Sequence, residues 1–335
     1  MHATTLEQRP FRWDSQSTQD IKRSYGGNCA VYEREILSHL RDADTEHLGY
    51  PHLSTLVDSF EHDGPNGRHV CLVFHVMSDT PLGYRQMLPG QKMHDAIPQR
   101  VAVQLLLALD YAHTIGVIHT DIKPSNVFVL LEDESLISAS YLPATAADPA
   151  AFDPSTKSWL IKSQPIALYC PDFKLTSEVN IALDDWGVAT WSNAHLTELI
   201  QPVPLQAPEV LTWASWGSTV DLWNLGAMLL EATRGKRMFS GKTPPDGKYD
   251  IRMHLREIEE MFGPFPKLFL DAGDPEIIQD CFDEDGKVKH FSNFSRPALE
   301  SPWCMEGLTH ETSILLSAFL RKVMKMDPTK RKNTM

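Results

Sequence analysis

The chain has 335 residues, of which 42% are hydrophobic, enough for one large domain or two lobes with a sizeable core. It carries 31 Lys and Arg residues against 44 Asp and Glu residues, a formal net charge of −13. That charge argues against direct binding of nucleic acid, whose phosphates would be repelled, and it fits either a basic protein partner or simple solubility. The five cysteines include no Cys-x-x-Cys pair, which indicates free thiols rather than a disulfide framework or a zinc site.

The N-terminus lacks the apolar core of a signal peptide, and no run is apolar enough to span a bilayer, so we expect no membrane association. Residues 1–24 are polar and without a clear period, and we expect them to be irregular. Residues 31–40 predict a helix with Ile36, Leu37 and Leu40 on one side. Two apolar runs, 53–60 and 70–74, flank the turn sequence at 64–67 and predict a β-hairpin.

Residues 101–113 are strongly apolar and predict a buried helix that ends before Gly116. From about residue 131 to 165 the composition shifts to Ala, Ser, Pro and Asp, which favours an exposed insert without a core of its own. Residues 179–183 then predict a strand.

The C-terminal half is mainly helical in its patterning. Residues 205–235 have helical spacing and several tryptophans, and further helices are predicted over 254–262 and 308–326. Early strands followed by many helices predict an α+β fold with a small sheet-bearing part and a larger helical part.

The stretch that best indicates chemistry is His119-Thr120-Asp121-Ile122-Lys123-Pro124-Ser125-Asn126. It holds an acid, an amine and an amide on a short turn between two apolar segments, a layout suited to a hydroxyl, a phosphate and a metal ion. It matches the catalytic loop of protein kinases, in which His, Asp and Asn have this spacing. A satisfied polar pair of His119 and Asp121 in an ordinary turn is the simpler alternative.

Four further motifs follow in the order found in kinases. They are Asp185-Trp186-Gly187, Ala207-Pro208-Glu209, Asp221-Leu222-Trp223-Asn224-Leu225-Gly226 and Asp327-Pro328-Thr329-Lys330-Arg331. Each is weak evidence alone, because Asp-x-Gly is commonly a turn and Asp-Pro a helix stop. Five motifs in the right order and local structure together favour the kinase fold.

The run from Ile118 to Pro124 resembles the serine/arginine-rich-protein kinase family, which has Thr where most kinases have Arg. Tyr25-Gly26-Gly27, residues 60–74 and residues 185–191 also resemble fungal members of that family. The resemblance covers about residues 20–335. It implies a two-lobe α+β fold with a partial N-lobe and hinge at 25–77 and a mainly helical C-lobe at 78–335, which contains the insert.

The resemblance implies a serine/threonine protein kinase that uses ATP and Mg²⁺. Asp121 would accept the proton of the substrate hydroxyl, and Lys123 would neutralise the γ-phosphate. Asn126 and Asp185 would hold the magnesium ion. Arg331 would pair with Glu209.

The ATP-binding residues implied by the resemblance lie earlier in the chain. Glu33 would pair with an ATP-binding lysine. Adenine would lie against His75, Val76 and Met77, with Phe74 at the back of the pocket. Thr120 removes the arginine that grips a phosphorylated activation segment in many kinases, so we expect no dependence on phosphorylation of residues 185–209.

The sequence departs from the family before Glu33, since it has no Gly-x-Gly-x-x-Gly loop, and Lys22 is too close to Tyr25 for the family spacing. The resemblance is therefore to a kinase truncated at its N-terminus. The alternative is a pseudokinase that acts as a protein-binding module with little or no catalysis. A metal-dependent hydrolase that uses His119 and Asp121 would need a second ligand cluster, which the sequence lacks.

The expected partner is a protein substrate, basic or Arg/Ser-rich, by analogy with the family. We expect a monomer located in the cytoplasm, the nucleus or both.

Overall fold

The computed structural model describes residues 32–64, 67–88, 94–131, 133–145, 151–153, 158–160, 165–166, 176–235, 237–243, 247–289 and 297–331. The chain divides into two compact units. Unit 1 takes in residues up to 108 and residues 125–188, and unit 2 takes in residues 109–124 and 189–335. Residues 1–24, which include Lys22, lie outside the described residues. The three-part division inferred from the sequence stays a prediction.

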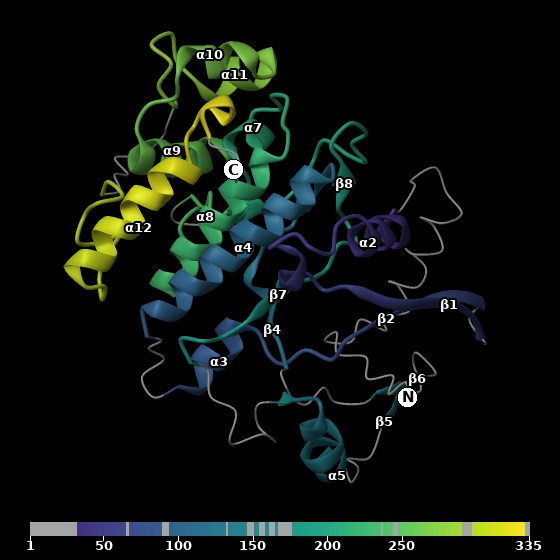
Figure 1. Cartoon of the computed structure of the whole chain (residues 1–335). Helices are drawn as coiled ribbons and strands as arrows, with labels where there is room; N and C mark the ends of the chain where they lie inside the picture. The colour runs from purple at the N-terminus through teal and green to yellow at the C-terminus, as the bar shows by residue number, and fades with distance from the viewer. Residues whose placement is uncertain are drawn as a thin grey trace. The chain divides into compact units, whose positions relative to one another are not determined.

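Unit 1 contains the predicted helix and hairpin. Helix α2 (Glu33–Asp42) buries Ile36, Leu37 and Leu40, as its spacing predicts, and it packs against β1. Strand β1 (Leu56–Gly64) pairs antiparallel with β2 (Gly67–Phe74), and the hairpin extends along one side of Figure 1. Both predictions are confirmed.

A second strand pair in unit 1 joins segments far apart in the sequence. Strand β4 (Val127–Val129) pairs antiparallel with β7 (Ile181–Leu183), and all of these residues are buried. The predicted strand at 179–183 is thereby confirmed in its second half. The remaining elements are η1 (Tyr50–His52), α3 (Pro81–Met87), η4 (Ile137–Tyr141), α5 (Leu142–Thr145), β5 (Ala151–Asp153) and β6 (Ser158–Leu160), with β5 and β6 paired.

The segment between β4 and β7 differs in part from the sequence prediction of an insert without a core. Leu131, Ile137 and Ile166 form a buried cluster, against which Val76 and Tyr141 pack. The expectation is wrong for this part of the insert, because a few apolar side chains in a polar segment suffice to anchor one turn of helix against a neighbouring strand end.

Helix α4 (Ala96–Thr114) runs through both units, from residues 96–108 of unit 1 to residues 109–114 of unit 2. It begins five residues before the predicted start at Val101, because Pro98 falls in its first turn, where the missing N–H is tolerated. It ends before Gly116, which has a φ of 80°. This left-handed backbone favours glycine and confirms the predicted end of the helix.

Unit 2 is mainly helical. Its elements are β3 (Val117–Ile118), paired with β8 (Thr190–Trp191), then η5 (Val203–Leu205), α7 (Pro208–Leu211), α8 (Thr219–Arg234), α9 (Ile251–Phe262), α10 (Lys267–Ala272), α11 (Pro275–Cys281), α12 (His310–Val323) and η6 (Pro328–Lys330). The short η3 (Pro124–Asn126) crosses the boundary between the two units. The helices predicted near 254–262 and 308–326 correspond to α9 and α12. The α+β class is confirmed.

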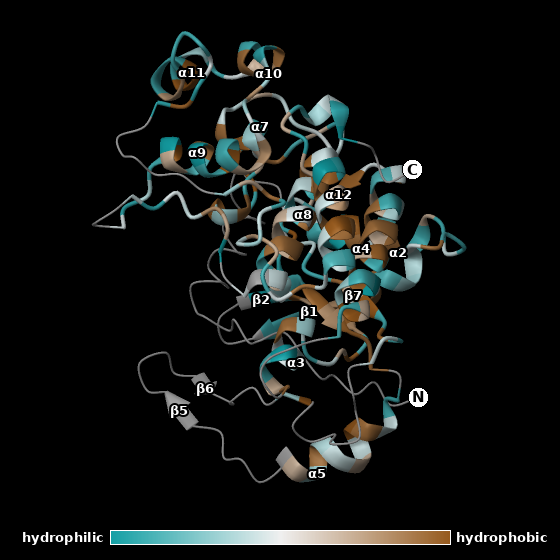
Figure 2. Cartoon of the chain, turned by 90° about the vertical axis from the view of Figure 1, so that its left-hand side faces the viewer, coloured by the Kyte–Doolittle hydropathy of each residue, from teal (hydrophilic) through white to brown (hydrophobic). Residues whose placement is uncertain are grey.

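Helix α8 forms the core of unit 2. Leu222, Leu225 and Leu230 are buried at the spacing seen in the sequence, and Figure 2 shows apolar colouring along α8 and α12. These two helices pack together at Gly226, where a Cβ atom would lie 2.5 Å from Met324 Cγ. The glycine of the fourth motif therefore permits close packing of the two helices. No helix within the described residues is long and apolar enough to cross a membrane.

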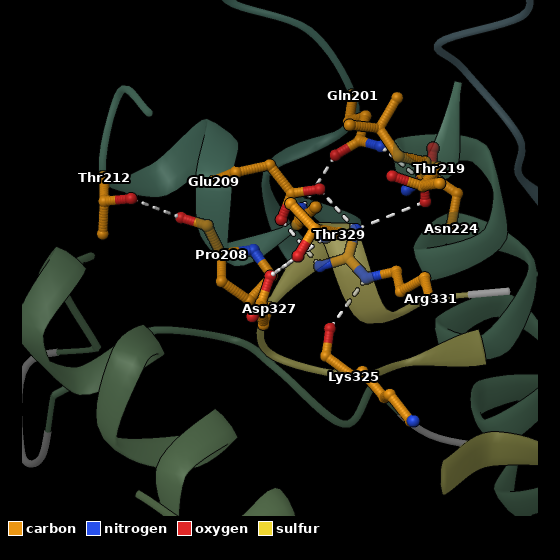
Figure 3. Close-up of polar contacts among 12 residues, drawn as sticks. Gln201, Pro208, Glu209, Thr212, Thr219, Asn224, Lys325, Asp327, Thr329 and Arg331 are labelled. Carbon is orange, nitrogen blue, oxygen red and sulfur yellow. Dashed lines mark hydrogen bonds and ion pairs between the residues drawn. The ribbon is translucent and has the colours of Figure 1, made fainter. Parts of the chain in front are cut away.

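A buried ion pair joins α7 to the last turn of unit 2. Arg331 Nη2 donates to Glu209 Oε2 at 2.7 Å, Arg331 Nη1 donates to Glu209 Oε1, and both side chains are fully buried (Figure 3). Arg331 Nε also donates to the carbonyl oxygen of Lys325 at 2.7 Å. The guanidinium lies over the ring of Trp223 at 5.2 Å. This confirms the Arg331–Glu209 pair that the resemblance implied.

Because both charges are buried, removing one partner should cost far more than losing a surface pair. We expect Glu209→Gln to lower the free energy of unfolding by about 3–5 kcal/mol, since Arg331 would be left buried and unpaired. Urea unfolding measures this value. The matched control is Glu300→Gln, because Glu300 pairs with Arg321 on the exposed surface and should lose less than about 1 kcal/mol. Equal losses in the two variants would contradict a structural role for the buried pair.

Candidate active site

The loop that carries Asp121 is hydrogen-bonded to one buried carboxylate in unit 2. Asp221, on α8, is fully buried, and its Oδ2 accepts the backbone N–H of His119 at 2.9 Å. Its Oδ1 accepts the N–H of Thr120 at 2.9 Å, and its Oδ2 also contacts His113 Nε2 at 2.8 Å. Both N–H groups can face one carboxylate because Thr120 has a φ of 65°. That conformation is strained for a β-branched residue, and the Asp221 contacts hold it in place.

The two predicted catalytic side chains of unit 2 are in contact. Lys123 Nζ donates to Asp121 Oδ2 at 2.5 Å, and the Asp121 side chain is 16% exposed. The backbone N–H of Asp121 donates to Nδ1 of the buried His119 at 3.2 Å. A carboxylate and an ammonium group are thus presented together on a loop of fixed shape, open to solvent on one side.

In unit 1, the strand pair β4–β7 brings Asn126 next to the second motif. Asn126 directly precedes β4, and its carbonyl oxygen accepts the backbone N–H of Asp184 at 2.8 Å. Asp185 follows with a φ of 66°, which turns the chain away from the strand. Trp186 is 1% exposed, so the tryptophan that replaces phenylalanine still fills a packing position. Asn126 and Asp185 therefore lie next to the neighbouring ends of β4 and β7.

Side chains from α4 fix the position of β7. The buried Gln104 accepts the N–H of Ile181 at 2.8 Å and donates to the carbonyl oxygen of Val179 at 3.0 Å. Arg100 Nε donates to the same Val179 carbonyl at 2.7 Å. His52 Nδ1 lies 3.3 Å from the carbonyl oxygen of Ile181. Burial lowers the pKa of His52 despite this hydrogen bond, so a neutral imidazole donates to the strand.

Glu33 and Asp185 converge on Gly187 within unit 1. A Cβ atom at residue 187 would lie 3.4 Å from Asp185 Oδ1 and 3.5 Å from Glu33 Oε2. Hard carboxylate oxygens are the ligands that Mg²⁺ prefers, and Mg²⁺ usually keeps waters and phosphate oxygens as its other ligands. The carboxylate oxygens of Glu33 and Asp185 therefore have the chemistry of a magnesium–nucleotide site. The assignment of Asp185 and Asn126 as the Mg²⁺ ligands stays a prediction.

Three of the four residues expected to form the adenine pocket line one cavity. His75, Val76 and Met77 line a cavity of about 300 Å³. The other lining residues are Tyr50, Pro51, Leu53, Ser54, Thr55, Leu130, Leu131, Glu134 and Asn180. Phe74, Asn126 and Asp185 do not line this cavity, although the structure describes all three. Met77 also packs with Phe128 and Ala182 in a buried cluster. The adenine assignment of residues 74–77 stays a prediction.

The sequence did not single out His113, Gln104 or Arg100. Each lies on α4, and each has a partner about 75 to 110 residues away in the chain. The signal that could have found Gln104 is its polarity in the apolar run 101–113, because a polar side chain inside a buried helix must be hydrogen-bonded.

Comparison with known proteins gives the same assignment as the motifs. The family model described as protein kinase domain matches residues 20–139. Serine/threonine-protein kinase SRPK of Physarum polycephalum is 28% identical over 82% of this chain and 67% of its own length. A serine/threonine protein kinase of Aspergillus fumigatus is 29% identical over 90% of this chain and 71% of its own. Protein kinase dsk1 of Schizosaccharomyces pombe is 25% identical over 91% of this chain and 71% of its own.

These relatives match along most of the chain, well beyond the residues that the family model covers. The motifs lie in the kinase order, and the Arg331–Glu209 pair is formed. The chain thus contains a protein kinase domain, and along most of its length it is similar to serine/threonine protein kinases, one of them named SRPK.

Proposed function

We propose that this kinase transfers the γ-phosphate of Mg-ATP to serine or threonine in a basic, Arg/Ser-rich protein. The observation that carries the proposal is the Asp121–Lys123 contact on a loop fixed by the buried Asp221. It supplies a proton acceptor and a cation side by side, as phosphoryl transfer to a hydroxyl requires.

In the proposed mechanism, Asp121 orients the substrate hydroxyl and takes its proton on a carboxylate oxygen. The hydroxyl oxygen forms the new bond to the γ-phosphorus as the bond to the ADP oxygen breaks. Lys123, already in contact with Asp121, places its ammonium where negative charge develops on the transferred group. No general base other than Asp121 is needed for this step.

Asn126 and Asp185 would hold Mg²⁺, which when bound supplies positive charge to the phosphate oxygens. Asn126 is 3% exposed, so its orientation is set by the protein before a ligand arrives. Gln104 and Arg100 hold the strand that leads to Asp185, which reduces the reorganisation needed on binding. Glu33 would orient the lysine that contacts the phosphates.

Net charge and the relatives support a basic substrate. The formal charge of −13 favours association with Arg-rich segments. One relative is named serine/threonine-protein kinase SRPK. By analogy with that name, we propose an Arg/Ser-rich substrate for this chain. Acidic side chains on α9 contribute little, because Arg256 already pairs with Glu259 and Glu260 and the buried Glu257 accepts the N–H groups of Ser240 and Gly241. The net charge of the whole chain thus supports the proposal more than the acidic side chains of α9 do.

Binding of Mg-ATP should stabilise the folded chain. A ligand present at about ten times its Kd should raise the free energy of unfolding by about 1.4 kcal/mol, and we expect a corresponding rise in Tm by thermal shift. Asp185→Ala, or chelation of Mg²⁺, should abolish most of the shift. The control is Glu276→Ala, an exposed acid in the first turn of α11. A full shift in Asp185→Ala would contradict the assigned metal ligand.

Transfer itself is tested with radiolabelled ATP and an Arg/Ser-repeat peptide, using a Lys/Ser-repeat peptide of the same charge as control. We expect faster labelling of the Arg/Ser peptide, and Asp121→Asn should lower kcat by at least about 100-fold. Pretreatment with a phosphatase should leave the rate unchanged. If the wild-type chain shows the Mg-ATP shift but labels neither peptide, the binding-module alternative replaces the catalytic proposal.

A further inference from the structure

The part of the predicted activation segment that lies in unit 2, residues 189–209, is held by hydrogen bonds from uncharged side chains. At its start, the buried Thr190 accepts the N–H of Leu196 at 3.0 Å and donates to the carbonyl oxygen of Ala194 at 3.1 Å. One threonine thereby closes the loop of residues 190–196. Neither contact involves an arginine side chain.

The end of the segment is held in the same way. Gln201 has a φ of 71°, a strained conformation for this residue type. Its side chain donates to the carbonyl oxygen of Val220 at 2.9 Å and accepts the N–H of Ala207 at 2.8 Å. Asn224 donates to the carbonyl oxygen of Leu205 at 2.6 Å. These contacts fix residues 201–207 against α8 (Figure 3 shows Gln201 and Asn224).

The middle of the segment is held by Trp216. The indole is 8% exposed and stacks on the ring of His195, with centroids 3.7 Å apart and planes 5° from parallel. Its Nε1–H donates to the carbonyl oxygen of Glu198 at 3.2 Å, and the Glu198 carboxylate lies 3.4 Å from His195 Nδ1. One side chain thus fixes both ends of the stretch 195–198, although residues 197–199 are themselves exposed.

We propose that Trp216 is a positioning residue for protein-substrate binding, which acts by holding residues 195–198 in place. This inference rests on the proposed function, and it further places the protein substrate along the exposed residues 197–199 of this segment. Thr120 leaves the chain without the arginine that grips a phosphorylated segment in many kinases. The indole supplies a fixed, uncharged contact in that role, so the substrate-facing backbone is ordered before the substrate arrives.

Variants of Trp216 separate its two contacts. Trp216→Phe keeps a ring for stacking and removes the Nε1–H, and Trp216→Leu removes both contacts. His195→Leu removes the stack from the other side. A hydrogen bond and an aromatic pair each contribute roughly a fivefold factor. We therefore expect KM for the protein substrate to rise about fivefold in Trp216→Phe and at least about tenfold in Trp216→Leu.

The expected signature is confined to the protein substrate. KM for ATP and the Mg-ATP thermal shift should stay within about twofold of wild type, because Trp216 holds the segment and not the nucleotide residues. The matched control is Trp213→Leu, which changes an indole three residues away that is 59% exposed. If Trp216→Leu lowers Tm without raising KM beyond the Trp213→Leu value, Trp216 is purely structural and the proposal is wrong. Should Trp216→Leu not fold, Trp216→Phe and His195→Leu decide the question by the same comparison.

Hydrogen–deuterium exchange tests the inference without any activity. In the full chain, amides of residues 192–200 should exchange at least about tenfold faster in Trp216→Leu than in Trp213→Leu, since local opening becomes easier when an anchor is lost. Equal exchange in the two variants would overturn the positioning role. A chain that shows the exchange difference but phosphorylates no protein would contradict the proposed function and leave the structural basis of this inference intact.

Discussion

The carboxylate of Asp221 is the constraint on which the catalytic loop depends. It is fully buried, and an ionised carboxylate without partners would be too costly to bury. Three donors surround it, namely the N–H groups of His119 and Thr120 and the imidazole of His113. The loop between β3 and η3 is therefore shaped around an acid supplied by α8. Its strained Thr120 persists because straightening that residue would remove a donor from a buried charge.

Neutral side chains also hydrogen-bond to the backbone of other irregular segments and fix their positions. Gln104 holds β7, Gln201 holds the turn before α7, and Trp216 holds the exposed stretch before it. In each case a side chain bonds backbone groups of an irregular segment that could not satisfy them by regular pairing. The functional residues thus sit on loops, but their positions are set by side chains of the helices α4 and α8 and the turn between α7 and α8.

Much of the fold follows from local patterns in the sequence. The spacing of Leu222, Leu225 and Leu230 was enough to predict α8, and a glycine-rich turn between apolar runs was enough for the β1–β2 hairpin. The start of α4 was missed because Pro98 looks like a helix stop until its place in the first turn is known. The buried cluster of Leu131, Ile137 and Ile166 was missed because its members are few and lie far apart in a polar segment.

The residue types of the candidate site could be predicted from the sequence. The side chains that hold those residues in position could not. Asp121 and Lys123 stand two residues apart in one motif, so their contact follows from the spacing alone. The partners of Asp221 and Gln104 depend on contacts across roughly 75 to 110 residues, and no local period encodes such pairs. Likewise, two tryptophans three residues apart differ in their exposure to solvent. Trp216 is buried and stacks on His195, whereas Trp213 is exposed and has a φ of 53°.

The pairing of β4 with β7 has a consequence for how this chain can vary. These strands meet over three residue pairs, and the intervening chain leaves β4 after Val129 and returns to β7 at Ile181. Closing a longer loop costs little extra entropy, about 0.6 kcal/mol for each doubling of its length. The ladder, pinned by Gln104 and Arg100, can therefore accept lengthening or replacement of the loop while the strand ends beside Asn126 and Asp185 stay in register. It is a natural point at which evolution, or a protein engineer, could add a regulatory module to this enzyme.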